Sequence, residues 1–136
     1  MSKLVQELKQ DHEKLAQVLS AALSKGPTKE GLQLLTTSKA ALLAHLKKED
    51  TFLYPELKKA SLNDKNLKMT LDSFASDMEK VSKAALDFFN KWEKGGDGAE
   101  FMKDLSNLLA TLSNRIHREE TLLYPEFDKI ADKKAA

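Results

Sequence analysis

The sequence reads KEDTFLYPE at residues 48–56 and, aligned without a gap, REETLLYPE at residues 118–126. Each copy runs from a basic residue through two acidic residues to an apolar anchor and a Tyr-Pro pair that interrupts a regular helix. The copies lie 70 residues apart, about the length of one helical hairpin, so Glu49 and Glu119 are expected at the same level of a bundle. Two explanations fit this repeat: a two-fold related site to which both copies contribute, or a helix-ending motif that occurs twice.

Apolar residues recur at three- and four-residue steps around these copies, which predicts long amphipathic helices. Breakers at residues 25–27, 63–64 and 95–98 separate the helical segments. We expect four helices, at roughly 2–24, 28–59, 64–93 and 98–132. Short loops between long helices favour an all-α, antiparallel up-down-up-down four-helix bundle that spans residues 1–136 as one domain. A three-helix or coiled-coil arrangement fits this regular punctuation less well.

The composition fits one helical domain and indicates neither a nucleic-acid partner nor a membrane partner. Of the 136 residues, 41% are hydrophobic and 32% are charged, a balance suited to amphipathic helices around one core. The formal net charge of +1 favours neither nucleic acid nor an anionic membrane. No apolar run approaches the ~20 residues that cross a bilayer, so we expect a cytoplasmic protein.

Several kinds of reactive site are excluded by the residues present. The chain has no cysteine, which rules out disulfides, thiolate metal sites and a cysteine nucleophile. It has no recognisable nucleophile–base arrangement, phosphate loop or dinucleotide fingerprint. Glu119 and Glu120 are neighbours that point about 100° apart on a helix, so they do not form an acid–base pair. The sequence therefore offers no basis for assigning an enzyme.

Ionisable residues lie on or beside the apolar stripes, where burial is costly unless a group is paired or bound to a metal. These candidate metal ligands are His12, His45, Glu49 and Glu119. Four-helix bundles build metal sites from such inward imidazoles and carboxylates, and this donor set suits iron, manganese or zinc. Ordinary interpretations also exist: His12 as a hydrogen-bonded core residue, and His45 with Glu49 as a surface pair.

Three motifs together resemble the hemerythrin-like (HHE) domain. They are DHEKL at residues 11–15, H-x-x-x-E at residues 45–49, and the acidic turn before each Leu-Tyr-Pro. The resemblance covers nearly the whole chain, and it implies an antiparallel four-helix bundle with a non-haem di-iron centre held by histidines and bridging carboxylates. Familiar members carry or sense oxygen, respond to nitric oxide or handle iron. The four candidate residues match ligand positions of that family.

The departures from the family pattern concern the remaining ligands. Phe74 and Met78 stand where the third helix of the family offers histidines, and Arg115 stands where the fourth helix offers one. Three histidines in the whole chain are too few for the full ligand set, so a standard di-iron oxygen carrier is not expected. His117 falls well off the apolar stripe and is expected on the surface, unless a register change brings it in with Glu120.

Arg115 has two interpretations of its own. Its guanidinium could pair with Glu49 or Glu119 and replace the lost metal charge, while Phe74 and Met78 fill the remaining volume. Its position at the edge of the apolar stripe equally allows a surface location.

Three functions follow from these patterns. The preferred one is a remodelled hemerythrin-like protein that holds non-haem iron, as a single ion, with open positions for a small diatomic ligand. Such a protein would sense oxygen, nitric oxide or redox state, or handle iron. The second is a metal-free bundle that acts as a protein-interaction or regulatory module. The third is a self-associating bundle in which another chain supplies further metal ligands.

Overall fold

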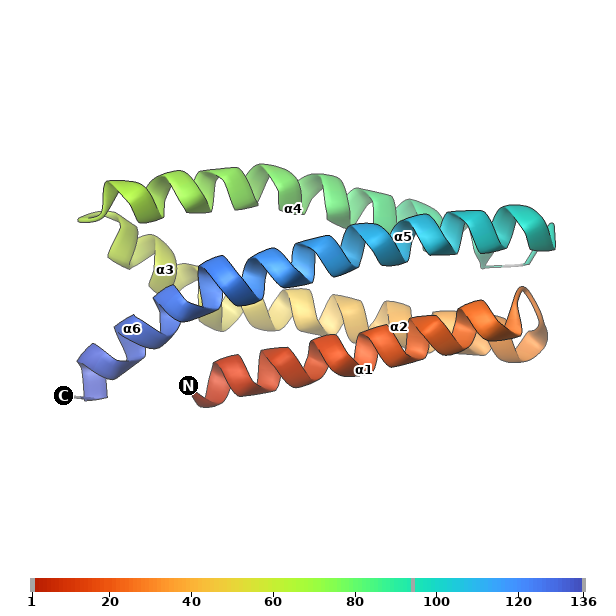
Figure 1. Ribbon diagram of the computed structural model, residues 1–136, viewed down its shortest axis with the longest axis horizontal. Helices are drawn as coiled ribbons and strands as arrows, with labels where there is room; N and C mark the ends of the chain where they lie inside the picture. The colour runs from red at the N-terminus through yellow and green to blue at the C-terminus, as the bar shows by residue number, and fades with distance from the viewer. Residues whose placement is uncertain (1, 94, 136) are drawn as a thin grey trace.

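The computed structural model describes residues 2–93 and 95–135, and these parts contain helices and no strand. The four long helices are α1 (Lys3–Lys25), α2 (Lys29–Lys48), α4 (Lys65–Trp92) and α5 (Gly98–Arg118). Figure 1 shows them running antiparallel, with the first and last described residues at the same end. Both α1 and α4 pack against α2 and α5, which closes the bundle. The predicted all-α four-helix bundle is confirmed.

Each long helix begins at a residue whose side chain caps it. In the first turns of α1, α2, α4 and α5, a backbone N–H donates to Ser2, Thr28, Asp64 and Asp97, respectively. Such caps satisfy amide groups that have no partner inside the helix. Gly26 follows α1 with φ of 67°, in the left-handed region that favours glycine. Short local signals therefore determine where these helices start and where α1 ends.

A π-helical turn follows both α2 and α5. The turns are η1 (Glu49–Leu53) and η2 (Glu119–Leu123), and they lead into the helices α3 (Tyr54–Ser61) and α6 (Tyr124–Ala135). The wider turn accommodates Pro55 and Pro125, which lack an N–H and would clash with the carbonyl four residues earlier in a regular helix. The helices expected at residues 28–59 and 98–132 are thus each built from three consecutive pieces, and they bend at one end of the bundle (Figure 1).

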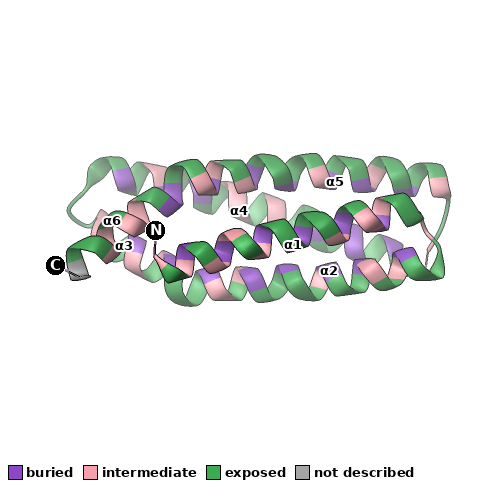
Figure 2. Cartoon of the chain, turned by 60° about the horizontal axis from the view of Figure 1, so that its bottom comes forward, coloured by how far each residue is buried: buried purple, intermediate pink, exposed green. Residues whose placement is uncertain are grey.

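The apolar core is divided into two clusters along the bundle. One cluster, around Leu19, Trp92 and Phe101, lies towards the loops that follow α1 and α4. The other, around Leu8 and Leu57, lies where α3 and α6 bend away. Figure 2 shows the buried residues on the inward faces of the long helices and the exposed residues on their outer faces. Buried polar side chains separate the two clusters.

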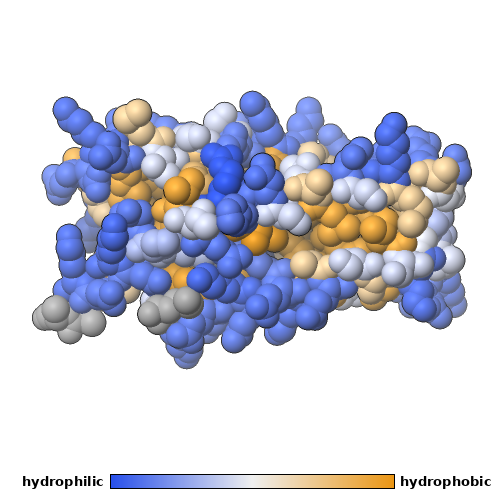
Figure 3. All heavy atoms as spheres, viewed as in Figure 1, coloured by the Kyte–Doolittle hydropathy of each residue, from blue (hydrophilic) through white to orange (hydrophobic). Residues whose placement is uncertain are grey.

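The outer surface carries mostly polar and charged side chains. Figure 3 shows them over much of one face, with apolar side chains in a strip between α5 and α1. Within the described residues, no helix combines the length and the apolar character needed to cross a membrane.

Candidate metal centre

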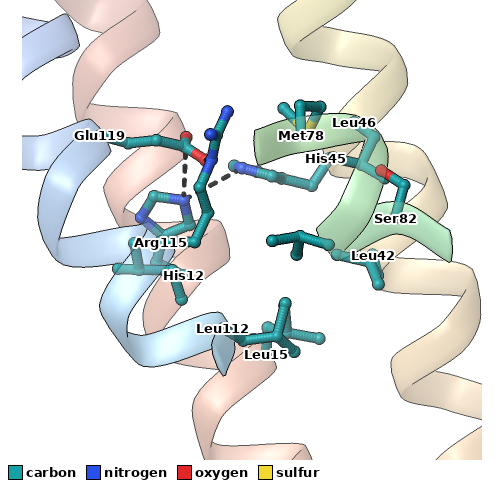
Figure 4. Close-up of a pocket in the computed structure, with 12 residues that line it drawn as sticks. His12, Leu15, Leu42, His45, Leu46, Met78, Ser82, Leu112, Arg115 and Glu119 are labelled. Carbon is teal, nitrogen blue, oxygen red and sulfur yellow. Dashed lines mark hydrogen bonds and ion pairs between the residues drawn. The ribbon is translucent and has the colours of Figure 1, made fainter. Parts of the chain in front are cut away.

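Five buried polar side chains meet between the two apolar clusters and form one layer. They are His12, His45, Glu49, Arg115 and Glu119, with 0% to 5% of each residue exposed. Figure 4 shows the two imidazoles, the guanidinium and the Glu119 carboxylate directed towards one another. Burying so many ionisable groups is costly unless they neutralise one another or a bound ion.

The two imidazoles face each other through their inner nitrogens. The Nε2 atoms of His12 and His45 lie 3.1 Å apart. Their outer Nδ1 atoms lie 3.2 Å from Glu120 Oε2 and 3.1 Å from Asp11 Oδ2, respectively. A neutral ring that donates its Nδ1–H to an outer carboxylate has an unprotonated Nε2, whose lone pair points inward. Two such lone pairs repel each other unless a proton or a cation lies between them.

The outer carboxylates, which belong to Asp11 and Glu120, are placed to orient the two imidazole rings. Lys48 Nζ lies 2.9 Å from Asp11 Oδ2 and anchors it. Burial alone would raise the pKa of Asp11, but its contacts with Lys48 and His45 outweigh burial and lower it. Glu120 reaches His12 from the groove between α1 and α5. A carboxylate behind each imidazole is the usual arrangement around metal-binding histidines.

The two inner carboxylates, Glu49 and Glu119, approach each other around a tyrosine hydroxyl. The hydroxyl of Tyr124 lies 2.9 Å from Glu119 Oε2 and 3.2 Å from Glu49 Oε2. Glu49 Oε1 lies 3.2 Å from His45 Nε2 but without the geometry of a hydrogen bond, so it has no donor among the residues that the structure describes. A buried carboxylate oxygen without a donor is rare, and a bound cation or a water molecule is its usual explanation.

Arg115 occupies the other side of the layer. Its Nε lies 2.9 Å from Glu119 Oε1, and its terminal nitrogens donate to the Phe74 carbonyl at 3.2 Å and to the Tyr54 hydroxyl at 2.9 Å. The guanidinium carbon also lies 4.5 Å from the centre of the Phe74 ring, within cation–π range. The interpretation of Arg115 as a core residue is therefore correct, and its surface location is wrong because these partners draw it inward.

Two ion pairs mark equivalent positions in the two halves of the bundle. Lys48 of α2 pairs with Asp11 of α1, and Arg118 of α5 pairs with Asp77 of α4. Lys48 and Arg118 are the first residues of the two copies of the sequence repeat. Because each pair joins the two helices of one hairpin, Asp11 and Asp77 are structural equivalents.

The residues beside these pairs differ between the two halves. The residues that follow the two aspartates are His12 and Met78. His45 and Arg115 are equivalent as well, because each precedes its π-turn glutamate by four residues. One half thus has two imidazoles where the other half has a thioether and a guanidinium. Donors suited to a metal ion are concentrated in the first half.

The charges in the layer influence one another strongly. Burial, together with the neighbouring Glu49 carboxylate, raises the pKa of Glu119 to about 8. Burial also disfavours the charged form of Glu49, but contacts with His45 and Glu119 outweigh it and lower the pKa of Glu49. Burial lowers the pKa of His12, whereas contacts with Glu49 and Asp11 outweigh burial at His45 and raise its pKa. Of the two inner carboxylates, Glu119 therefore holds a proton more readily than Glu49.

A cavity of about 30 Å³ adjoins the layer. The two facing histidines, Arg115 and Glu119 line its polar side, and Figure 4 shows Leu15, Leu42 and Leu112 to one side of them. A space of this size can hold a water molecule or a ligand of similar size. The layer thus has room for a small ligand next to its donor atoms.

The structure brings the four predicted ligand residues into one layer. Of these, His12, His45 and Glu119 present atoms within 4.8 Å of one another and could hold a metal ion. The interpretation of His45 and Glu49 as a surface pair is wrong, because their helical face is covered by α1 and the π turns. His117 is exposed, as expected.

Sequence reasoning missed three residues of this site, namely Asp11, Tyr54 and Tyr124. The recurring Tyr-Pro pair was the available signal for the tyrosines. Residues five apart lie about 140° apart on an α-helix, so periodicity does not predict that Tyr124 faces Glu119. The π turn brings the two together, through a bond from the Tyr124 N–H to the Glu119 carbonyl.

Comparison with known proteins gives a family match. The hemerythrin HHE cation-binding domain matches residues 3–127, most of the chain. No curated protein and no solved structure matches the chain.

Proposed function

The chain belongs to the hemerythrin HHE cation-binding domain family, and on this premise we propose that it binds a single non-haem iron ion. The proposed ligands are His12, His45, Glu49 and Glu119. The observation that carries the proposal is the fully buried Glu49 Oε1, which lacks a hydrogen-bond donor among the described residues. At this depth a carboxylate oxygen needs a donor or a cation, and two imidazole lone pairs converge beside it.

The donor set supports the choice of metal. Imidazoles and carboxylates suit iron, manganese and zinc better than the alkaline earths, and the chain has no thiolate to offer a softer ion. Among the three metals, the resemblance to non-haem iron proteins favours iron.

The opposite half of the layer supports one ion rather than two. The guanidinium of Arg115 lies 2.9 Å from Glu119 and packs on the Phe74 ring. It brings a permanent positive charge to the side where a second metal ion would otherwise bind. A second cation at this distance would be repelled in a poorly solvated interior.

An iron ion held here would supply Lewis-acid and redox chemistry to a small molecule in the adjoining cavity. The residues of the chain orient and shield that site: Asp11 and Glu120 hold the imidazoles, Arg115 offers a positive charge, and the leucines limit the access of water. These features support a role in sensing oxygen, nitric oxide or redox state, or in handling iron.

Metal content tests the proposal directly. Untagged protein should be purified without chelator from iron-supplemented cells and examined by elemental analysis and visible spectroscopy. We expect about one iron per chain, lost in His45→Ala and retained in the control His117→Ala, because His117 is exposed away from the layer. Less than about a tenth of an equivalent of any metal in a cooperatively folded protein would contradict it.

A metal-free module that binds another protein is the second candidate, and Arg115 favours it. The guanidinium together with the proton on Glu119 can neutralise both inner carboxylates without an ion. This candidate predicts thermal unfolding that is unchanged by chelator, with low metal content. A fractional metal content together with a concentration-dependent mass would indicate instead a site shared between chains.

A further inference from the structure

We propose that Tyr124 is a fifth ligand of this site and that its phenolate oxygen favours the ferric state of the bound iron. The inference rests on the proposed iron binding and adds a residue that neither periodicity nor the family match assigns.

The hydroxyl of Tyr124 lies among the atoms proposed to hold the ion. It is 3.2 Å from His12 Nε2, 2.9 Å from Glu119 Oε2 and 3.2 Å from Glu49 Oε2. Atoms that share one metal ion at bond lengths of about 2.1 Å lie about 3.0 to 3.4 Å from their neighbours. The two imidazole Nε2 atoms show the same spacing, at 3.1 Å. The hydroxyl therefore has the separation of a neighbouring ligand from three of the donor atoms.

The backbone and the packing of the ring hold the Tyr124 hydroxyl at this position. The π turn aligns Tyr124 with Glu119, which precedes it by five residues. Only 1% of Tyr124 is exposed. Its ring stacks on His12 with centroids 5.7 Å apart and planes 14° apart. π-helical turns of this kind occur frequently at functional sites.

The hydroxyl of Tyr124 faces more acceptors than it has hydrogens to donate. The phenol has one hydrogen, whereas two carboxylate oxygens and an imidazole nitrogen lie within hydrogen-bonding distance of it. Coordination to a metal ion would replace the phenol hydrogen, which passes to solvent, and would leave the oxygen as an anionic ligand.

Tyr54 provides a contrast at the equivalent position of the first π turn. Its hydroxyl accepts a hydrogen bond from Arg115 at 2.9 Å, so its oxygen is already paired with a cation of the chain. These two are the only tyrosines in the sequence. A phenolate signal from the protein must therefore come from Tyr124 or Tyr54, and single substitutions assign it.

Ligation by the Tyr124 phenolate affects which oxidation state of the bound iron is favoured. An anionic oxygen donor stabilises ferric iron more than ferrous iron, because the attraction grows with the charge of the ion. A phenolate added to two carboxylates makes the site rich in negative oxygen donors. Reversible oxygen carriage needs ferrous iron, so within the proposed function this ligand favours iron retention or a redox role.

The experiment compares the full-length wild type, Tyr124→Phe and Tyr54→Phe after loading with ferric citrate. Iron per chain, visible absorption and resonance Raman spectra are recorded for each protein. We expect a phenolate-to-iron charge-transfer band, with tyrosinate vibrations, in the wild type and in Tyr54→Phe. Tyr124→Phe should lose both signals while it retains most of its iron on the other four ligands.

The outcomes separate this inference from the proposed function. Iron-loaded wild type without tyrosinate vibrations overturns ligation by Tyr124 and leaves iron binding intact. A signal that persists in Tyr124→Phe and disappears in Tyr54→Phe overturns it as well. Failure of all three proteins to bind iron overturns both proposals. The wild-type Raman spectrum is decisive even if Tyr124→Phe does not fold.

Discussion

Arg115 and Glu119 form an ion pair in the middle of the bundle, with Nε 2.9 Å from Oε1 and each side chain 4% exposed. The glutamate is a proposed metal ligand, and the arginine stands where the family resemblance implies a histidine. A cation that belongs to the chain thus occupies one side of the layer. This arrangement keeps the bundle of the family while it changes the charge and the ligand set of the proposed metal centre.

Replacing Arg115 should destabilise the iron-free protein. Arg115→Met removes the buried partner of Glu119 together with the hydrogen bonds to Phe74 and Tyr54. We expect a loss of about 3 kcal/mol in the free energy of unfolding. This value is near the lower end of the losses seen when a buried ion pair is broken, because Glu119 can take up a proton when its partner is removed. Urea denaturation measures the loss.

The matched control is Arg118→Met, which removes the partially exposed pair with Asp77. It should change the free energy of unfolding by less than about 1 kcal/mol. Equal losses in the two variants would show that the buried pair has no special role.

Restoring histidines to the second half of the layer should change the number of bound ions. In the triple variant Phe74→His, Met78→His and Arg115→His, elemental analysis should find about two irons per chain instead of about one. The double variant that retains Arg115 is the control and should remain near one, because the guanidinium repels a second cation. A triple variant that folds but binds no additional iron would argue against this account of Arg115.

The outer carboxylates should tune metal affinity without contacting the ion. Asp11→Asn and Glu120→Gln weaken the acceptors behind the two imidazoles, at 3.1 Å and 3.2 Å. We expect each change to lower the affinity for iron by about 10- to 100-fold in a chelator competition. Glu13→Gln is the control, since Glu13 is an exposed neighbour of His12. Unchanged affinity in both outer variants would remove these carboxylates from the site.

The stability of the iron-free protein should depend on the proton held by Glu119. Folding raises the pKa of this group from 4.5 to about 8, so the folded state binds the proton more tightly than the unfolded state. The contribution of Glu119 is therefore fully present below 4.5 and is lost as the pH rises through about 8.

Glu119→Gln keeps the shape of the side chain without titrating. The wild type should lose stability as the pH rises from 4.5 to about 8, whereas this variant should not. The free energy of unfolding of the variant should therefore increase relative to that of the wild type, and urea denaturation at several pH values measures it. Glu13→Gln should show no such trend. A constant difference between Glu119→Gln and the wild type would mean that Glu119 is ionised throughout.

Local patterns predicted much of the fold because helices depend on neighbouring residues. Breakers at residues 25–27, 63–64 and 95–98 predicted where helices end and begin, and apolar periodicity predicted their inward faces. The same periodicity identified His12 and Glu119 as polar residues at buried positions. It did not identify Tyr124, because the π turn shifts the helical phase between Glu119 and Tyr124.

The sequence by itself determined the four-helix architecture, the repeated acidic turns and the types of donor available to a metal ion. Only the tertiary structure decided that Arg115 lies in the core, that the Nε2 atoms of His12 and His45 meet at 3.1 Å, and that Tyr124 joins them. The physical reason is that periodicity describes the face of a single helix. Contacts between helices depend on their rotation and axial offset, which the packing of both apolar clusters sets for the bundle as a whole.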